Sequence, residues 1–103
     1  SPEARAVADR VTAQSIAAFE RETAALLAAG GEGDTAALRA AWARIFAGCT
    51  MQGDAHARLH MFLEPLAEGL RRVDATSGAA RLPALREMLR QLSTFDARFS
   101  VAA

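Results

Sequence analysis

With 103 residues, the chain is long enough for one domain around a single hydrophobic core, and we expect residues 1–103 to form that domain. Twelve Arg balance twelve acidic residues, and this zero net charge without a basic face argues against nucleic-acid binding. No apolar run approaches the ~20 residues of a membrane span, and a single Cys excludes an internal disulfide.

The first predicted helix covers residues 4–29, an alanine-rich run without Pro or Gly. Pro2 suits its first turn, and Gly30 and Gly31 end it. At ~100° per residue, one face collects small and apolar side chains: Ala8, Val11, Thr12, Ser15, Phe19, Thr23 and Leu26. We expect this face to be buried and Asp9 to be a solvated charge.

The second predicted helix runs from about residue 36 to residue 49 or 50. Its apolar side chains recur at spacings of four, three and four: Leu38, Trp42, Ile45 and Cys49. This spacing predicts that Cys49 points inward in the last turn and that Trp42 is an anchor of the core. Gly53 is a natural stop after this helix.

The third predicted helix extends from Ala55 to about Val73, with Asp54 as its N-cap. Its core face is apolar throughout: Leu59, Phe62, Leu63, Leu66, Leu70 and Val73. We expect His56 close to the centre of that face and His60 at its flank, whereas Met61 should point away from the core.

The fourth predicted helix begins near Pro83 and reaches about Phe99. Its buried stripe is again apolar: Leu82, Leu85, Leu89, Leu92, Phe95 and Phe99, with Met88 beside it. Strand signals are absent. Four helices joined by three short connections predict an all-α protein, an antiparallel up-down-up-down four-helix bundle.

The strongest functional signal is the stretch from Cys49 to Met61. It holds the only Cys, both His and two of the three Met of the chain. Thiolate, thioether and imidazole groups bind soft and borderline transition metals, copper above all. The turn between the second and third helices should bring Cys49 beside His56, with Met51 free to fold over them. We therefore predict Cys49, Met51, His56 and His60 as copper ligands, with Met61 an auxiliary ligand if the helix unwinds.

Each of these residues also has a structural explanation. A lone Cys in an apolar stripe behaves as a small hydrophobic residue, and a His pair at i and i+4 is by itself a weak metal signal. It is the clustering of four donors around one Gly-containing turn that favours a metal site.

A resemblance follows from the same residues. The run C-T-M-x-G-x-A-H-x-x-L-H-x-F-L, Cys49 through Leu63, resembles a signature of small exported bacterial four-helix proteins of unassigned function. The resemblance implies a four-helix fold and an exported protein, and it agrees with the donor set at Cys49, Met51, His56 and His60. It implies no activity.

We therefore expect a copper-binding protein that carries, buffers or transfers the ion or an electron, and not an enzyme. Its expected partners are the metal ion and a protein with which metal or electrons are exchanged, and the chain should be a monomer or a homodimer. The opening Ser-Pro-Glu-Ala suits the end left by a removed signal peptide, so the expected location is periplasmic.

Two alternatives remain beside the copper interpretation. One is a structural or partner-binding bundle without metal, whose Cys and His only close the turn. The other is a haem-binding bundle that uses a His and a Met, although no C-x-x-C-H attachment motif is present.

Overall fold

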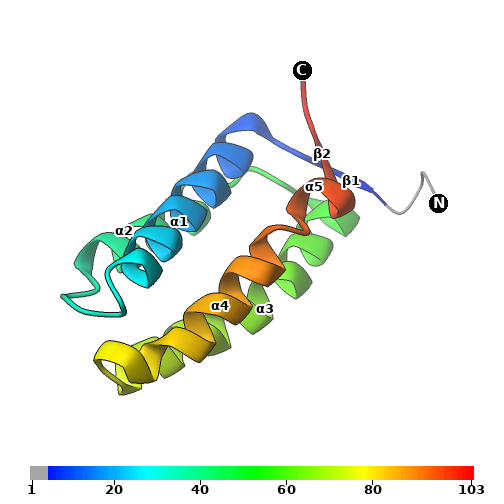
Figure 1. Cartoon of the computed structure of the whole chain (residues 1–103). Coiled ribbons are helices and arrows are strands. Elements are labelled where there is room, and N and C mark those ends of the chain that lie inside the picture. Colours follow the sequence, from blue (N-terminus) through cyan, green and yellow to red (C-terminus); the bar gives the residue numbers. More distant parts are fainter. Residues whose placement is uncertain (1–4) are drawn as a thin grey trace.

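The computed structural model describes residues 5–103, and this part of the chain is mostly helical (Figure 1). Its elements in chain order are β1 (Ala6–Ala8), α1 (Arg10–Ala28), α2 (Ala36–Ala47), α3 (Gly53–Ala75), the 3₁₀ turn η2 (Gly78–Arg81), α4 (Leu82–Leu92), α5 (Phe95–Arg98) and β2 (Phe99–Val101). The four longer helices agree with the predicted all-α class. The predicted role of Pro2 and the predicted helix start at residue 4 lie outside the described residues.

The absence of strands was a wrong prediction, because β1 and β2 pair in parallel, with Ala6 opposite Phe99 and Ala8 opposite Val101. Ala6 and Ala8 are buried while Val7 is exposed, which is the period-two pattern of a strand. Residues 5–9 were predicted to be helical, and this prediction was wrong. The two strands lie at one end of the molecule (Figure 1), and their partnership joins segments 93 positions apart in sequence.

The fourth helix is shorter than predicted, because α4 ends at Leu92. The hydroxyl groups of Ser93 and Thr94 donate to the carbonyl oxygens of Arg90 and Gln91, at 2.6 and 2.7 Å, and so compete with continued helical bonding. The chain then turns into α5 and β2. Phe95 and Phe99 are nevertheless buried, as the stripe predicted.

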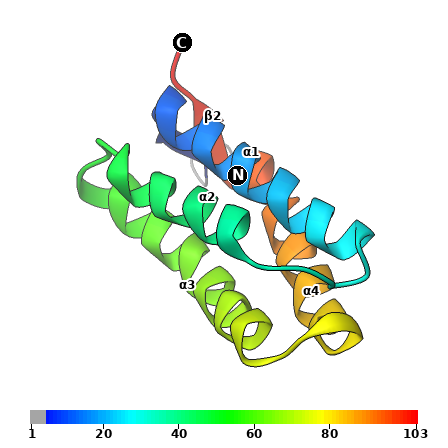
Figure 2. The same ribbon diagram turned by 90° about the vertical axis from the view of Figure 1, so that its left-hand side faces the viewer.

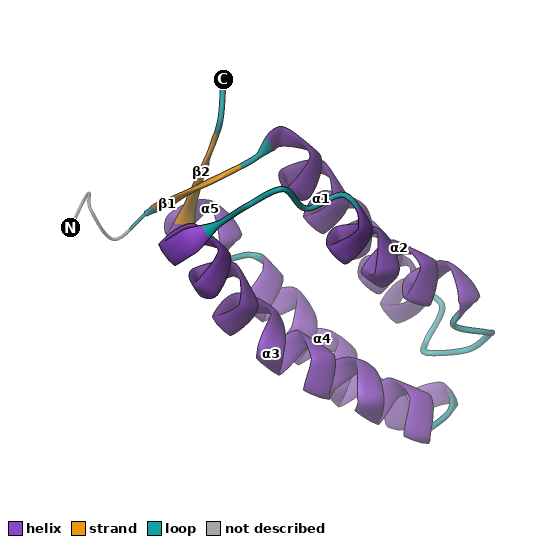
Figure 3. Ribbon diagram, turned by 180° about the vertical axis from the view of Figure 1, so that it is seen from behind, coloured by secondary structure: helices purple, strands orange, loops and turns teal. Residues whose placement is uncertain are grey.

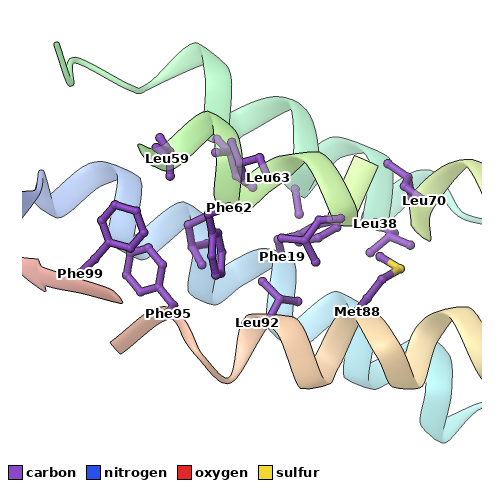
Figure 4. Close-up of a cluster of buried hydrophobic side chains, with 14 of the residues drawn as sticks. Phe19, Leu38, Leu59, Phe62, Leu63, Leu70, Met88, Leu92, Phe95 and Phe99 are labelled. Carbon is purple, nitrogen blue, oxygen red and sulfur yellow. The ribbon is translucent and has the colours of Figure 1, made fainter. Parts of the chain in front are cut away.

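The core lies between the helices and agrees with most of the predicted faces (Figure 4). All six predicted core residues of α3 are buried. On α1 the prediction was wrong at Val11, which is 51% exposed, and Ile16 is buried instead. Three rings close the core near the strands: Phe62 contacts Phe95 and Phe99 at centroid distances of 5.6 and 5.9 Å, and Phe95 stacks on Phe99 at 4.9 Å.

The helices form two hairpins, α1 with α2 and α3 with α4, that lie alongside each other (Figures 2 and 3). Extensive helix packing is found between α1 and α2, between α3 and α4, and between α1 and α4. The connection between α2 and α3, residues 48–52, therefore passes from one hairpin to the other at the end that carries the strands (Figure 3). No described helix is both long and apolar enough to cross a membrane.

Arg81 joins the loops at the opposite end. Its Nη1 donates to the carbonyl oxygens of Gly31 and Gly33, at 3.0 and 2.8 Å, and its Nε donates to those of Val73 and Thr76, at 3.0 and 2.9 Å. One guanidinium thus fixes the α1–α2 loop against the end of α3.

Candidate metal centre

The two histidines lie one turn apart at the start of α3, both exposed, with ring centroids 4.4 Å apart. The predicted place of His56 near the centre of the core face was wrong. Ala55, four residues before Leu59, continues the buried line and packs against the core, so the next side chain is turned about 100° toward solvent. His60 is likewise exposed. The pair can present two imidazole nitrogens to one ion from a single helix face.

Cys49 lies in the connection and not in the last turn of a helix, because α2 ends at Ala47 with Gly48 as its C-cap. Its side chain is half-buried and packs against the core, so the predicted inward direction holds in part. Met51 lies in the connection as predicted and packs against the core in the same way. The start of α3 at Gly53, with φ at +64°, makes Asp54 a first-turn residue and not the predicted cap.

The connection is attached to the start of α1 by Asp9, a residue for which the sequence predicts only a solvated charge. One oxygen, Oδ1, accepts from the Thr12 backbone N–H at 2.7 Å and caps α1. The other, Oδ2, accepts from the Thr50 backbone N–H at 3.0 Å and from the Thr50 hydroxyl at 2.6 Å. Asp9 therefore holds the residue between Cys49 and Met51.

These bonds change the acidity of Asp9. Desolvation alone would raise the pKa of its carboxyl group, but the bonds donated by Thr12 and Thr50 outweigh that effect and hold the pKa well below its ordinary value. The available sequence signal was an Asp directly before an apolar periodic run, which is typical of an N-cap. The second partner, 41 positions away, has no local signal.

A row of rings connects the core with the two histidines. Phe19 contacts Trp42 at a centroid distance of 5.1 Å, Trp42 contacts Phe46 at 5.1 Å, and Phe46 contacts His60 at 6.4 Å. Phe19 is buried and Phe46 is 44% exposed, so the row passes from the interior to the surface and ends at His56. Half-buried Trp42 packs against the core, in agreement with its predicted role.

The predicted ligands form two pairs. Within residues 5–103, no three His, Cys, Asp or Glu side chains come together as a group that could hold a metal. The imidazoles of His56 and His60 are adjacent on α3, and Cys49 and Met51 flank Thr50 in the connection. The nearby carboxylate of Asp54 pairs with Arg58, Oδ2 to Nε, at 3.0 Å.

The pairs also differ in chemistry. Two neutral imidazoles suit Cu(II) and other borderline divalent ions, whereas a thiolate and a thioether suit Cu(I). Met61, the predicted auxiliary donor, is 70% exposed and points away from the core as expected. It lines a surface cavity together with Phe62.

The chain was compared with models of protein families, with curated proteins and with solved structures, and none of the three comparisons found a match.

Proposed function

We propose that this protein binds copper at the start of α3, with His56 and His60 as the anchoring ligands and Cys49 and Met51 as the donors that complete the site. The observation that carries the proposal is the contact of the two imidazoles, 4.4 Å between centroids, on an exposed helix face. An exposed pair is accessible to an ion from solvent without unfolding of the core. The proposed role is handling of copper or of an electron, and not catalysis.

Recruitment of the second pair would involve residues 49–52, the part of the connection that carries Cys49 and Met51. These residues have no regular secondary structure, and they are held by the contact of Thr50 with Asp9 and by the packing of Cys49 and Met51 against the core. Gly48 approaches α1 closely, since a Cβ there would lie 2.7 Å from Val11 Cγ1. The close packing of Gly48 on α1 leaves residues 49–52 as the segment that would shift. The ion would then bind where the two hairpins meet.

Titration of the apo-protein with Cu(II) in air and with Cu(I) under anaerobic conditions tests the proposal. Because Trp42 is two ring contacts from His60, bound Cu(II) should quench its fluorescence. His60→Ala should weaken Cu(II) binding by about tenfold or more, the loss of one ligand of a chelate. Cu(II) binding that is equal in His60→Ala and in the unmodified protein would refute the anchoring role of the pair.

The role of the sulfur donors is tested separately. Cys49→Ser and Met51→Leu keep the side-chain volume but remove the soft donor, and each should weaken Cu(I) binding by about tenfold. Met61→Leu is the matched control, since it removes an exposed thioether elsewhere on α3. Loss of Cu(II) binding only in His variants, with Cu(I) affinity unchanged in both sulfur variants, would reduce the site to the histidine pair.

The alternative is a structural or partner-binding bundle without metal. It is favoured by the packing of Cys49 and Met51 against the core, which is what structural residues do. If neither Cu(I) nor Cu(II) binds, the copper proposal is refuted in favour of this alternative. We also propose that α1 to α4 form an antiparallel up-down-up-down bundle, which is compatible with either function. The reversal of chain direction at each connection supports this arrangement (Figure 1). The proposed location is periplasmic, which fractionation of cells tests.

A further inference from the structure

A cavity of about 330 Å³ opens beside the strands, and its proposed role is independent of the copper proposal. Arg58, Met61 and Phe62 of α3 line it together with Arg98 of α5 and Phe99 of β2. Its volume lies at the lower end of the range of about 300–1,000 Å³ that is usual for ligand pockets, so a small molecule fits it.

The floor of this cavity is apolar and rigid. Phe62 and Phe99 are almost completely buried, and their rings lie in the cluster with Phe95 that closes the core (Figure 4). Met61 is mostly exposed, and its flexible thioether can cover an apolar ligand from the solvent side. An apolar body of a few carbons would therefore be partly removed from water, mainly by Met61 and the aliphatic parts of the arginine side chains, over the edges of the two buried rings.

Both charged side chains of the lining are cationic. Arg58 and Arg98 are the only charged residues among the five that line the cavity, so the lining has a charge of +2. The guanidinium of Arg58 also pairs with the carboxylate of Asp54, which is not part of the lining and which a ligand can replace. Guanidinium groups bind carboxylates in a bidentate geometry, and an apolar wall strengthens that interaction by excluding water.

We propose that this cavity binds a small amphiphilic monocarboxylate, with its carboxylate on Arg58 and Arg98 and its apolar body under Met61, against the edges of the Phe62 and Phe99 rings. The charge of the lining selects an anion, and the apolar floor selects one with a hydrocarbon body over an inorganic anion. No redox or group-transfer step is involved.

The test uses octanoate and the methyl groups of methionine labelled with ¹³C. Each of the three methionines reports a different place: Met61 the cavity, Met51 the candidate metal centre and Met88 the core. Octanoate should shift the Met61 methyl signal in a saturable way and leave those of Met51 and Met88 unchanged. An unchanged Met61 signal, or equal shifts of all three, would refute the proposal.

Charge selection is tested with 1-octanol and octylamine, which keep the chain and change the head group. Arg98→Gln and Arg58→Gln should each weaken octanoate binding by about tenfold, the usual effect of losing one charged hydrogen-bonding partner. Arg86→Gln is the matched control, an exposed arginine of α4 outside the cavity. Binding of octanol as tight as that of octanoate, or unchanged binding in Arg98→Gln, would show a plain apolar surface and overturn the proposal.

Discussion

Replacement of Asp9 by Asn separates its two roles, the capping of α1 and the attachment of residue 50. Asn is as good an N-cap as Asp, so the bond from the Thr12 N–H to Oδ1 should persist. The side chain of Asn, however, has a single acceptor oxygen. Its NH2 group, which takes the place of Oδ2, cannot accept the two bonds that Thr50 donates there. Asp9→Asn therefore releases the connection and leaves the helix start intact.

The expected cost follows from these contacts. The two bonds from Thr50 are solvent-exposed, and at about 0.5 kcal/mol each they contribute about 1 kcal/mol to the free energy of unfolding. In a domain of this length that loss lowers the melting temperature by about 4–5 °C. Asp9→Ala also removes the cap, so its cost should be about 2 kcal/mol.

The pH dependence gives an independent measurement. The pKa of Asp9 in the folded state lies below its ordinary value of 3.8, so its contribution to stability is fully present above that value and is lost as the pH falls toward the folded-state pKa. The difference in unfolding free energy between the unmodified protein and Asp9→Asn should thus be constant from pH 7 to about pH 5 and shrink below about pH 4. The difference is the useful quantity, because other carboxyl groups titrate in both proteins.

Urea unfolding followed by circular dichroism at several pH values provides these free energies. Thr50→Val is the matched variant, because it removes the hydroxyl bond to Asp9 and keeps the backbone N–H. The double variant should cost less than the sum of the two single ones, since both act on the same contact. Equal stability of Asp9→Asn and the unmodified protein at pH 7, or a difference that persists unchanged at pH 2, would refute this account of Asp9.

Three further outcomes are expected. Gly31→Ala should lower the free energy of unfolding in urea by about 2–4 kcal/mol, because the φ of Gly31 is +80° and a Cβ would lie 2.1 Å from the Gly78 carbonyl oxygen. Gly30→Ala is the control and should lower it by only about 1 kcal/mol, since Gly30 has a positive φ but open space around it. Equal losses in the two variants would exclude the clash. Leu66→Ala should cost about 2–5 kcal/mol because the side chain is fully buried, whereas Met61→Ala should change stability by less than about 0.5 kcal/mol; similar values for the two would contradict the placement of α3. Copper affinity should fall on acidification from about pH 7 to about pH 5, because a protonated imidazole or thiol cannot bind the ion, and a pH-independent affinity would exclude such ligands.

The helices were predictable where an apolar stripe continues for several turns. The six core residues of α3 repeat over four turns, and an error at one position does not change the phase of the others. Such a stripe specifies which side is buried wherever the helix has neighbours. In the first turn the stripe was continued to the wrong residue, because Ala55 and not His56 lies in line with Leu59 and packs against the core.

The strands were not predictable from local sequence. Residues 6–8 are Ala-Val-Ala, which has no strand-forming character beyond a single Val, and their partner segment lies at the other end of the chain. The pairing also explains Phe99, whose burial was predicted from a helical stripe and is achieved by a strand. The apolar character of this residue was sufficient for its burial, and the periodicity assigned the wrong backbone.

The candidate metal centre shows the same division between type and position. Residue types predicted the donor set, and the separation of His56 and His60 by one turn follows from helix geometry alone. The position of Cys49 could not be derived, because it depends on where α2 ends and on the bond between Thr50 and Asp9. That bond joins two connections, and no periodic pattern describes it.

Asp9 therefore relates the fold to the proposed function. It accepts bonds from Thr12 at the start of α1 and from Thr50 in the connection, so the first hairpin determines where the backbone between Cys49 and Met51 is held. If Cu(I) recruits these two donors to the histidines, the ion must break or stretch the contact with Asp9, and the contact opposes binding. Asp9→Asn should then bind Cu(I) about fivefold more tightly, the factor that corresponds to about 1 kcal/mol, while it unfolds more easily without metal. Competition with a coloured Cu(I) chelator measures this ratio, and an affinity lower than that of the unmodified protein would show that the attached connection is already the binding conformation.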